Sequence, residues 1–179
     1  TQVAAAAGYH VTMIDIQQEY VDKGLATIQR SLGKLVSKER MTQDDADATL
    51  ARIALSTDRA DCADCDLVVE AVPEIVDLKK SIFAELDAIC KPETILASNT
   101  SSISISTIAD ATNRPDKVIG MHFMNPVPIM KLVEVINGNK TSSETNAAVI
   151  EASETMGKIA LSCNDSPGFV SNRILCPML

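Results

Sequence analysis

Short apolar runs alternate along this chain with longer segments in which apolar residues recur every three or four positions. The runs favour β-strands, which we expect at 10–15, 66–72, 93–97, 117–122, 130–136 and 158–162. The periodic segments favour amphipathic helices, which we expect at 2–7, 19–38, 44–53, 78–89, 105–111 and 141–156. Because most strand runs are continuously apolar, we predict an α/β fold with a mostly parallel sheet covered by helices on both faces. The run 130–136 alternates apolar and polar residues, which predicts an edge strand or a strand with one exposed face.

Composition narrows the function classes. The 179 residues carry 16 Lys and Arg against 24 Asp and Glu, a formal charge of −8, and only 3% are aromatic. Nucleic-acid binding needs a basic surface and often stacking rings, so this composition argues against it. No run of about 18 apolar residues occurs, which argues against a membrane span.

The five cysteines lack framework spacing and suit a reducing compartment. Cys62 and Cys65 form a CxxC without a second ligand pair, so we expect structural cysteines and no metal site.

Ligands of open α/β sheets bind at the carboxyl ends of the strands, so the residues after each run are the candidates for a binding site. Asp15 closes the first predicted strand, where an acid binds the ribose hydroxyls of NAD and repels the 2′-phosphate of NADP. Glu70 lies near the end of the second predicted strand, and Glu74 and Lys79 follow it. The polar segment 98–102 follows the third predicted strand. Asp15 could equally belong to a turn, and segment 98–102 could be a turn with a helix N-cap.

Two further features suggest chemistry. His122 ends a predicted strand, and Glu134 lies in the next one, where a carboxylate could orient the imidazole and stabilise its protonated form. The alternative is a buried structural histidine with an unrelated exposed glutamate; His10, which begins a strand, is expected to be structural. The helix 19–38 also carries a basic stripe, either a solvated face or a contact for the phosphates of a large anionic substrate. The stripe consists of Lys23, Arg30, Lys34 and Lys38.

Four long motifs, at 97–102, 120–128, 130–135 and 165–173, resemble the 3-hydroxyacyl-CoA dehydrogenase family, and most of all its 3-hydroxybutyryl-CoA members. Their mutual spacing fits the family without gaps, and the resemblance covers essentially the whole chain. It implies a Rossmann-type, doubly wound NAD-binding domain over residues 1–165. It further implies the start of a C-terminal all-helical domain, through which the family forms homodimers, at 166–179.

The resemblance also implies the activity and the residues that carry it. The reaction is the NAD-dependent interconversion of (3S)-3-hydroxyacyl-CoA and 3-oxoacyl-CoA in fatty-acid or butanoate metabolism. His122 is the implied general base, Glu134 its partner, and Ser101 and Asn172 the residues that hold the substrate oxygen. The implied cofactor and substrate contacts are, for NAD, Asp15, Glu74, Lys79, Ser101 and Asn125, and, for coenzyme A, Ser31 and Lys38.

Two parts of the family pattern lie outside this sequence, namely the glycine loop of the first strand–helix turn and most of the helical domain. We therefore expect a piece of a longer protein that does not turn over alone, and we expect the protein to be cytoplasmic, with a mitochondrial or peroxisomal location open. The alternatives are a dehydrogenase of another hydroxy acid, a non-catalytic relative with a binding or crystallin-like structural role, and a segment of a multifunctional fatty-acid oxidation protein.

Overall fold

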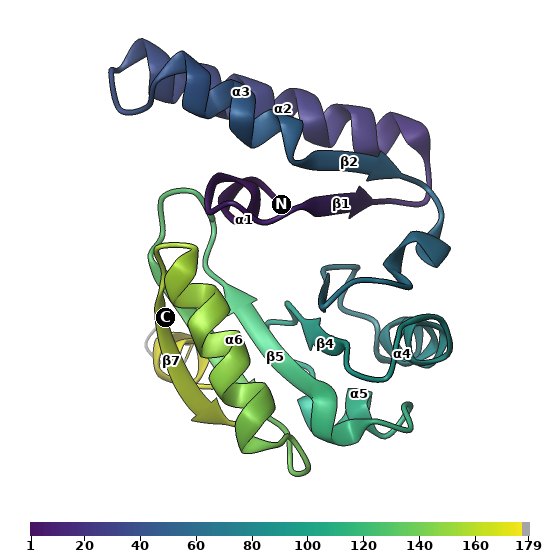
Figure 1. Cartoon of the computed structure of the whole chain (residues 1–179). Helices are drawn as coiled ribbons and strands as arrows, with labels where there is room; N and C mark the ends of the chain where they lie inside the picture. Colours follow the sequence, from purple (N-terminus) through teal and green to yellow (C-terminus); the bar gives the residue numbers. More distant parts are fainter. Residues whose placement is uncertain (177–179) are drawn as a thin grey trace. The chain divides into compact units, whose positions relative to one another are not determined.

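The computed structural model describes residues 1–176, which form two compact units, one from Thr1 to Asp61 and one from Cys62 onward. Strands alternate with helices along both units, which confirms the predicted α/β class (Figure 1). The elements of the first unit are α1 (Gln2–Ala6), β1 (Val11–Ile14), α2 (Gln18–Ser37), α3 (Gln43–Ala51), β2 (Ile53–Ser56) and the 3-10 helix η1 (Arg59–Cys62), which ends at its border.

The first unit packs its two longer helices around a small apolar core. Ile28 and Leu32 of α2 meet Ala46 of α3, and all three are buried. The hydroxyl oxygen of Thr42 accepts a hydrogen bond from the backbone N–H of Asp45 at 3.1 Å, which caps the start of α3. The apolar residues of α2 recur every three to four positions and therefore form a stripe along one side of the helix. This stripe packs against α3 and joins the two helices into one layer.

The strand β2 is an element that the sequence pattern missed. Residues 53–56 pair in parallel with β1, from Val11 opposite Ile53 to Ile14 opposite Ser56. The predicted helix 44–53 ends instead at Ala51. A segment of four residues that directly follows a helix is too short to show the alternation of apolar and polar residues that predicts a strand. This strand is therefore recognised only by its pairing with β1.

The second unit is built on a five-stranded sheet of order β3-β4-β5-β6-β7. All neighbouring pairs are parallel except β5 and β6, which are antiparallel. The elements of this unit are β3 (Leu67–Glu70), α4 (Val76–Ile89), β4 (Ile95–Ser98), α5 (Ile105–Ala109), η2 (Pro115–Lys117), β5 (Val118–Phe123), β6 (Leu132–Asn137), α6 (Ser143–Thr155), β7 (Ile159–Asn164) and α7 (Ser171–Leu175).

Both faces of the central strand β5 are covered. Ile119 and Met121 pack with Val149 of α6 on one face. Gly120 faces the other side, where a Cβ atom would lie 3.0 Å from the Cδ1 atom of Ile105 in α5. Successive side chains of a strand point to opposite faces, so the continuous apolar run reflects burial on both sides, as predicted.

The prediction of an edge or one-sided strand at 130–136 is wrong. β6 lies between β5 and β7, and its residues 133–136 are all buried. The polar residue that produced the alternation is Glu134, which is 0% exposed because it binds a histidine inside the protein. A polar position in this strand therefore indicated a buried hydrogen bond rather than a face exposed to solvent.

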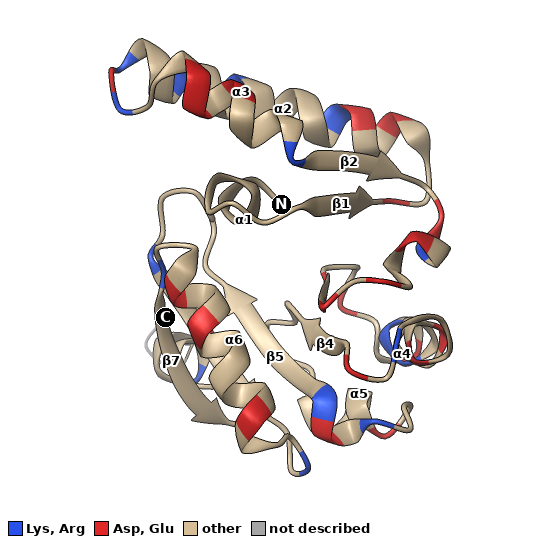
Figure 2. Ribbon diagram, in the orientation of Figure 1, with Lys and Arg blue, Asp and Glu red and all other residues tan. Residues whose placement is uncertain are grey.

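Charged residues lie mainly on the helices and connecting loops, while the labelled strands are almost wholly uncharged (Figure 2). No helix in residues 1–176 is long and apolar enough to cross a membrane. The predicted start of a helical domain at 166–179 stays a prediction: the structure has the short helix α7 there, and residues 177–179 lie outside the described part.

Candidate active site

The antiparallel register of β5 and β6 brings together the two residues that the sequence marked for acid–base chemistry. His122 is directly opposite Glu134, so their side chains stand on the same face of the sheet. The Nδ1 atom of His122 lies 2.8 Å from Oε2 of Glu134, and both side chains are buried. A buried imidazole–carboxylate hydrogen bond orients the ring and stabilises its protonated form.

The charge of Glu134 is held by two backbone amides from a distant loop. Its Oε1 atom accepts hydrogen bonds from the N–H groups of Val170 at 3.1 Å and Ser171 at 2.7 Å. Burial alone raises the pKa of Glu134, but the hydrogen bonds from His122, Ser171 and Val170 outweigh it and lower the pKa below its ordinary value. Glu134 is therefore a carboxylate at neutral pH and only accepts hydrogen bonds.

This carboxylate decides the tautomer of the ring. Because Glu134 offers no proton, Nδ1 of His122 carries the hydrogen and Nε2 of the neutral ring keeps its lone pair. Within residues 1–176, Nε2 has no hydrogen-bond partner. The Phe169 ring packs edge-on to the imidazole at a centroid distance of 5.9 Å. In its neutral form the ring thus presents a proton acceptor, which is what a general base requires.

The loop that supplies the two amides is held by a turn and by a half-buried acid. Gly168 and Phe169 both adopt positive φ angles, of 75° and 52°. A Cβ atom at position 168 would lie 3.0 Å from the backbone nitrogen of Arg173, so the turn requires glycine. Asp165 ties the start of this loop to α5, since its carboxylate accepts from the Ser104 hydroxyl at 2.7 Å and from the Ser106 N–H at 2.8 Å.

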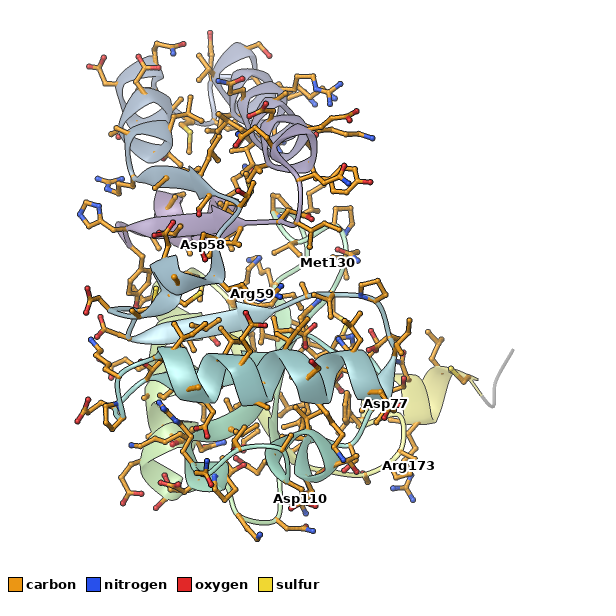
Figure 3. All side chains as sticks on the ribbon, turned by 90° about the vertical axis from the view of Figure 1, so that its right-hand side faces the viewer. Asp58, Arg59, Asp77, Asp110, Met130 and Arg173 are labelled. Atoms are coloured by element: carbon orange, nitrogen blue, oxygen red, sulfur yellow. The ribbon has the colours of Figure 1, made fainter. Side chains whose placement is uncertain are left out.

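A second group of charged side chains lies at the ends of β3 and β4. Lys79 is 1% exposed, and its ammonium group donates to Glu70 Oε1 at 2.7 Å, to the Val72 carbonyl at 3.0 Å, and lies 3.3 Å from Glu74 Oε2. Lys79 lies on α4, near the N-terminal end of this helix, where Figure 3 labels Asp77 of the first turn. The ammonium group of Lys79 therefore makes two hydrogen bonds inside the protein, and its charge is balanced by two carboxylates.

Glu74 faces the loop after β4. Its carboxylate accepts hydrogen bonds from the Thr100 hydroxyl at 2.8 Å and from the backbone N–H of Ser101. Burial raises the pKa of Glu74, but these bonds and the positive charge of Lys79 outweigh it and lower the pKa below its ordinary value. Glu74 therefore remains ionised, with lone pairs that can accept from hydroxyl groups.

A pocket of about 310 Å³ opens at these strand ends. Its lining residues are Ala71, Val72, Pro73, Glu74, Lys79, Asn99 and Ser101. A carboxylate acceptor beside amide and hydroxyl donors is the set that binds ribose hydroxyls, and the carboxyl ends of strands are where dinucleotides bind in such sheets. The residues present therefore fit the ribose of a nicotinamide cofactor.

One hydrogen bond links the pocket to the loop beside His122. The side-chain amide of Asn172 donates to the backbone carbonyl of Ser101 at 3.1 Å. Asn172 directly follows Ser171, whose N–H binds Glu134. His122, Glu134, Asn172 and Ser101 are thus joined by one chain of contacts.

Four further residues of the expected site are described by their own surroundings, one in the second unit and three in the first. Asn125 is exposed in the loop after β5, and its side chain forms no hydrogen bond with residues 1–176. Asp15, Ser31 and Lys38 belong to the first unit. Asp15 accepts from the N–H of Ile16 at 2.7 Å, Ser31 is half-buried in α2, and Lys38 is exposed at the C-terminal end of that helix.

Glu70 is a residue of this arrangement that the sequence reasoning noted at a strand end but did not include in the site. Its two carboxylate oxygens bind Lys79 and, at 2.6 Å, the hydroxyl of Ser98. The signal was present, because an acid that closes an apolar run belongs at a sheet edge, but nothing in the sequence shows which cation it meets.

Metal binding and catalysis by a cysteine nucleophile are two other chemistries to compare with residues 1–176. Among residues 1–176, no group of three or more His, Cys, Asp or Glu side chains could hold a metal ion. Burial, with the charges of Glu134 and Asp165, raises the pKa of Cys163 to about 11. That thiol is therefore protonated at neutral pH and is a poor nucleophile.

A mostly parallel α/β domain with a strand-end pocket for ribose and a buried His–Glu pair is of the Rossmann type and typical of nicotinamide-dependent dehydrogenases. A sequence model of the 3-hydroxyacyl-CoA dehydrogenase NAD-binding domain matches residues 1–166. The chain belongs to this family, which confirms the resemblance seen in its motifs and the choice of NAD.

Similar proteins agree with this assignment. A probable 3-hydroxybutyryl-CoA dehydrogenase of Deinococcus radiodurans is 56% identical over 178 residues, which are 99% of this chain and 64% of that protein. A probable 3-hydroxybutyryl-CoA dehydrogenase of Bacillus subtilis is 48% identical over 99% of this chain and 62% of its own length. The crystal structure of (S)-3-hydroxybutyryl-CoA dehydrogenase from Ralstonia eutropha superposes with a TM-score of 0.97 at 49% identity, covering 99% of this chain and 62% of that one. The chain thus spans somewhat less than two thirds of these relatives.

Proposed function

We propose that the protein containing this chain interconverts (3S)-3-hydroxyacyl-CoA and 3-oxoacyl-CoA with NAD, with His122 as the general base. The observation that carries this proposal is the 2.8 Å bond between His122 Nδ1 and Glu134, which leaves Nε2 as a proton acceptor. Bound NAD supplies the hydride acceptor for the hydrogen on C3 of the substrate. The residues of this chain handle the proton of the 3-hydroxyl group.

The proton moves as follows. Nε2 of His122 accepts the hydroxyl proton as the C3 carbon becomes a carbonyl, and the ring becomes an imidazolium. The carboxylate of Glu134 stabilises this cation through Nδ1–H, while Val170 and Ser171 keep the carboxylate ionised. In the reverse direction the imidazolium returns the proton to the oxygen.

The remaining site residues receive binding roles in this proposal. Ser101 and Asn172 orient the substrate oxygen, which their mutual hydrogen bond supports. Glu74, Lys79, Ser101 and Asn125 bind the nicotinamide half of NAD. In the first unit, Asp15 binds the adenosine ribose, and Ser31 and Lys38 on α2 bind coenzyme A.

The chemistry and the relatives disfavour the alternatives. The Psychrobacter arcticus fatty acid oxidation complex subunit alpha is 42% identical, less than the 56% and 48% of the two probable 3-hydroxybutyryl-CoA dehydrogenases. The paired His122 and Glu134 are also unneeded in a purely structural relative. We further propose a cytoplasmic location, in keeping with the bacterial relatives, and a homodimer that pairs through a helical domain beginning near residue 166.

The proposal is tested with His122→Gln in the intact protein. Reduction of acetoacetyl-CoA by NADH, followed at 340 nm, should lose about 10²- to 10⁴-fold in kcat, because general acid–base catalysis contributes that much. The affinity for NADH should stay within about twofold, since the ring does not line the strand-end pocket. His10→Gln, at an exposed position of the first unit, is the matched control and should behave as wild type. Turnover of the His122 variant within threefold of wild type would show that another group is the base.

A further inference from the structure

Asn99 connects the ends of three neighbouring strands. It directly follows β4, and its backbone N–H donates to the carbonyl of Glu70 on β3 at 2.8 Å. Its side-chain oxygen accepts from the backbone N–H of Phe123 on β5, also at 2.8 Å. The β4–β5 ladder pairs residues only as far as Ser98 opposite Gly120, so beyond that point this side chain takes the place of the ladder. Phe123 adjoins His122, so Asn99 holds the strand end that carries the proposed base.

The same bond fixes which way the amide points. The backbone N–H of Phe123 can only donate, so the atom it meets is the carbonyl oxygen of Asn99 and not its nitrogen. The NH₂ group is therefore turned away from β5. Within residues 1–176 it has no hydrogen-bond partner, and it is not enclosed. Because Asn99 also lines the pocket beside Glu74, its two N–H hydrogens are available there.

The pocket has few other side-chain donors, because its cation is buried among protein oxygens. The Lys79 ammonium group donates to Glu70 and to the Val72 carbonyl, lies 3.3 Å from Glu74, and belongs to a residue that is only 1% exposed. Glu74 is ionised and accepts only. Among the lining side chains, the neutral donors without a hydrogen-bond partner in residues 1–176 are the Asn99 amide and the Ser101 hydroxyl. A ribose carries hydroxyl groups that donate and accept, so it is matched by a carboxylate facing an amide donor.

We propose that Asn99 has two roles: its NH₂ group donates to a ribose hydroxyl oxygen in the nicotinamide half of NAD, and its carbonyl oxygen positions β5 and hence His122. This inference rests on the proposed function. It makes Asn99 a binding residue for the cofactor and a positioning residue for the base, so that one side chain sets the separation between them.

Two variants in the intact protein separate the roles. Asn99→Ala removes both the donor and the acceptor, whereas Asn99→Asp removes the donor but keeps an oxygen for the N–H of Phe123. In calorimetric titrations without substrate, both should bind NADH about five- to tenfold more weakly, the effect of losing one hydrogen bond. In turnover of acetoacetyl-CoA at saturating NADH, kcat should fall about tenfold in Asn99→Ala and stay within threefold in Asn99→Asp.

Matched controls are Asn139→Ala and Asn139→Asp, at an exposed position that follows the opposite end of the β5–β6 pair. They should leave NADH affinity and kcat unchanged. The proposal is overturned if either Asn99 variant binds NADH as wild type does, or if Asn99→Asp loses as much kcat as Asn99→Ala. Absence of any turnover by the wild-type protein would refute the proposed function instead, while the NADH titrations would still decide the binding role of Asn99.

Discussion

Replacement of Glu134 by glutamine tests the central contact of the site with a nearly isosteric change. The glutamine oxygen can still accept from Val170 and Ser171. Its NH₂ group then faces Nδ1 of His122, where the carboxylate oxygen lies at 2.8 Å in the wild type. An amide donor there forces Nδ1 to accept and moves the ring hydrogen to Nε2. The ring then presents a donor to the substrate hydroxyl and is no longer a base.

The magnitude follows from the lost interaction. A hydrogen bond to a charged group contributes about 1.5–3 kcal/mol, which at about 1.36 kcal/mol per tenfold equals roughly 10- to 150-fold in rate. The reversed tautomer adds to this, and the analogous change in a Ser-His-Asp triad lowers kcat by about 10⁴-fold. We therefore expect Glu134→Gln to lower kcat by about 10²- to 10⁴-fold. Glu134→Asp, which keeps the charge, should lose less.

The assay is the pH dependence of acetoacetyl-CoA reduction in the intact protein. Without the carboxylate, the limb of the profile that reports the imidazolium should move to lower pH, because the cation has lost its counter-charge. Glu154→Gln, on the exposed surface of α6, is the matched control. A Glu134→Gln protein that folds normally, turns over within threefold of wild type and keeps the wild-type profile would refute the assigned role.

Two further predictions concern the scaffold and are measured by urea unfolding. Gly120→Ala should lower the free energy of unfolding by about 1–3 kcal/mol, because the new Cβ would lie 2.8 Å from the Cβ and Cδ1 atoms of Ile136; an unchanged midpoint would mean that the sheet yields freely there. Asp165→Asn should cost about 1–3 kcal/mol at pH 7, because a half-buried carboxylate that accepts from Ser104 and Ser106 loses its charge. Burial raises the pKa of Asp165, but hydrogen bonds from Ser106 and Ser104 outweigh it and lower the pKa. The carboxylate thus stabilises the fold above its unfolded-state pKa of about 3.9 and loses this effect as the pH falls through the lower folded-state value. The difference between Asp165→Asn and wild type should therefore shrink toward pH 2, and a difference independent of pH would contradict the charge-based account.

Local patterns were sufficient to predict most of the elements of this protein. Residues 19–38 were predicted as a helix and form α2 over Gln18–Ser37, because an apolar stripe with a period of three to four residues needs no distant partner to be recognised. Residues 117–122 were likewise predicted as a strand, and the structure has β5 at Val118–Phe123. The strand-end motifs were long enough to indicate the family and the residues to inspect, and placed His122 and Glu134 on successive strands.

Only the tertiary structure decided which of those residues meet. β2 exists because β1 lies beside it, and β6 can be an inner strand because Glu134 finds hydrogen-bond donors inside the protein. The amides that hold Glu134 lie 36 and 37 residues further along the chain, and Asn99 binds a strand end 24 residues away. Hydrogen bonds between such distant groups depend on sheet order and register, which are set by the packing of the whole unit, whereas period and capping are set by neighbours in the sequence.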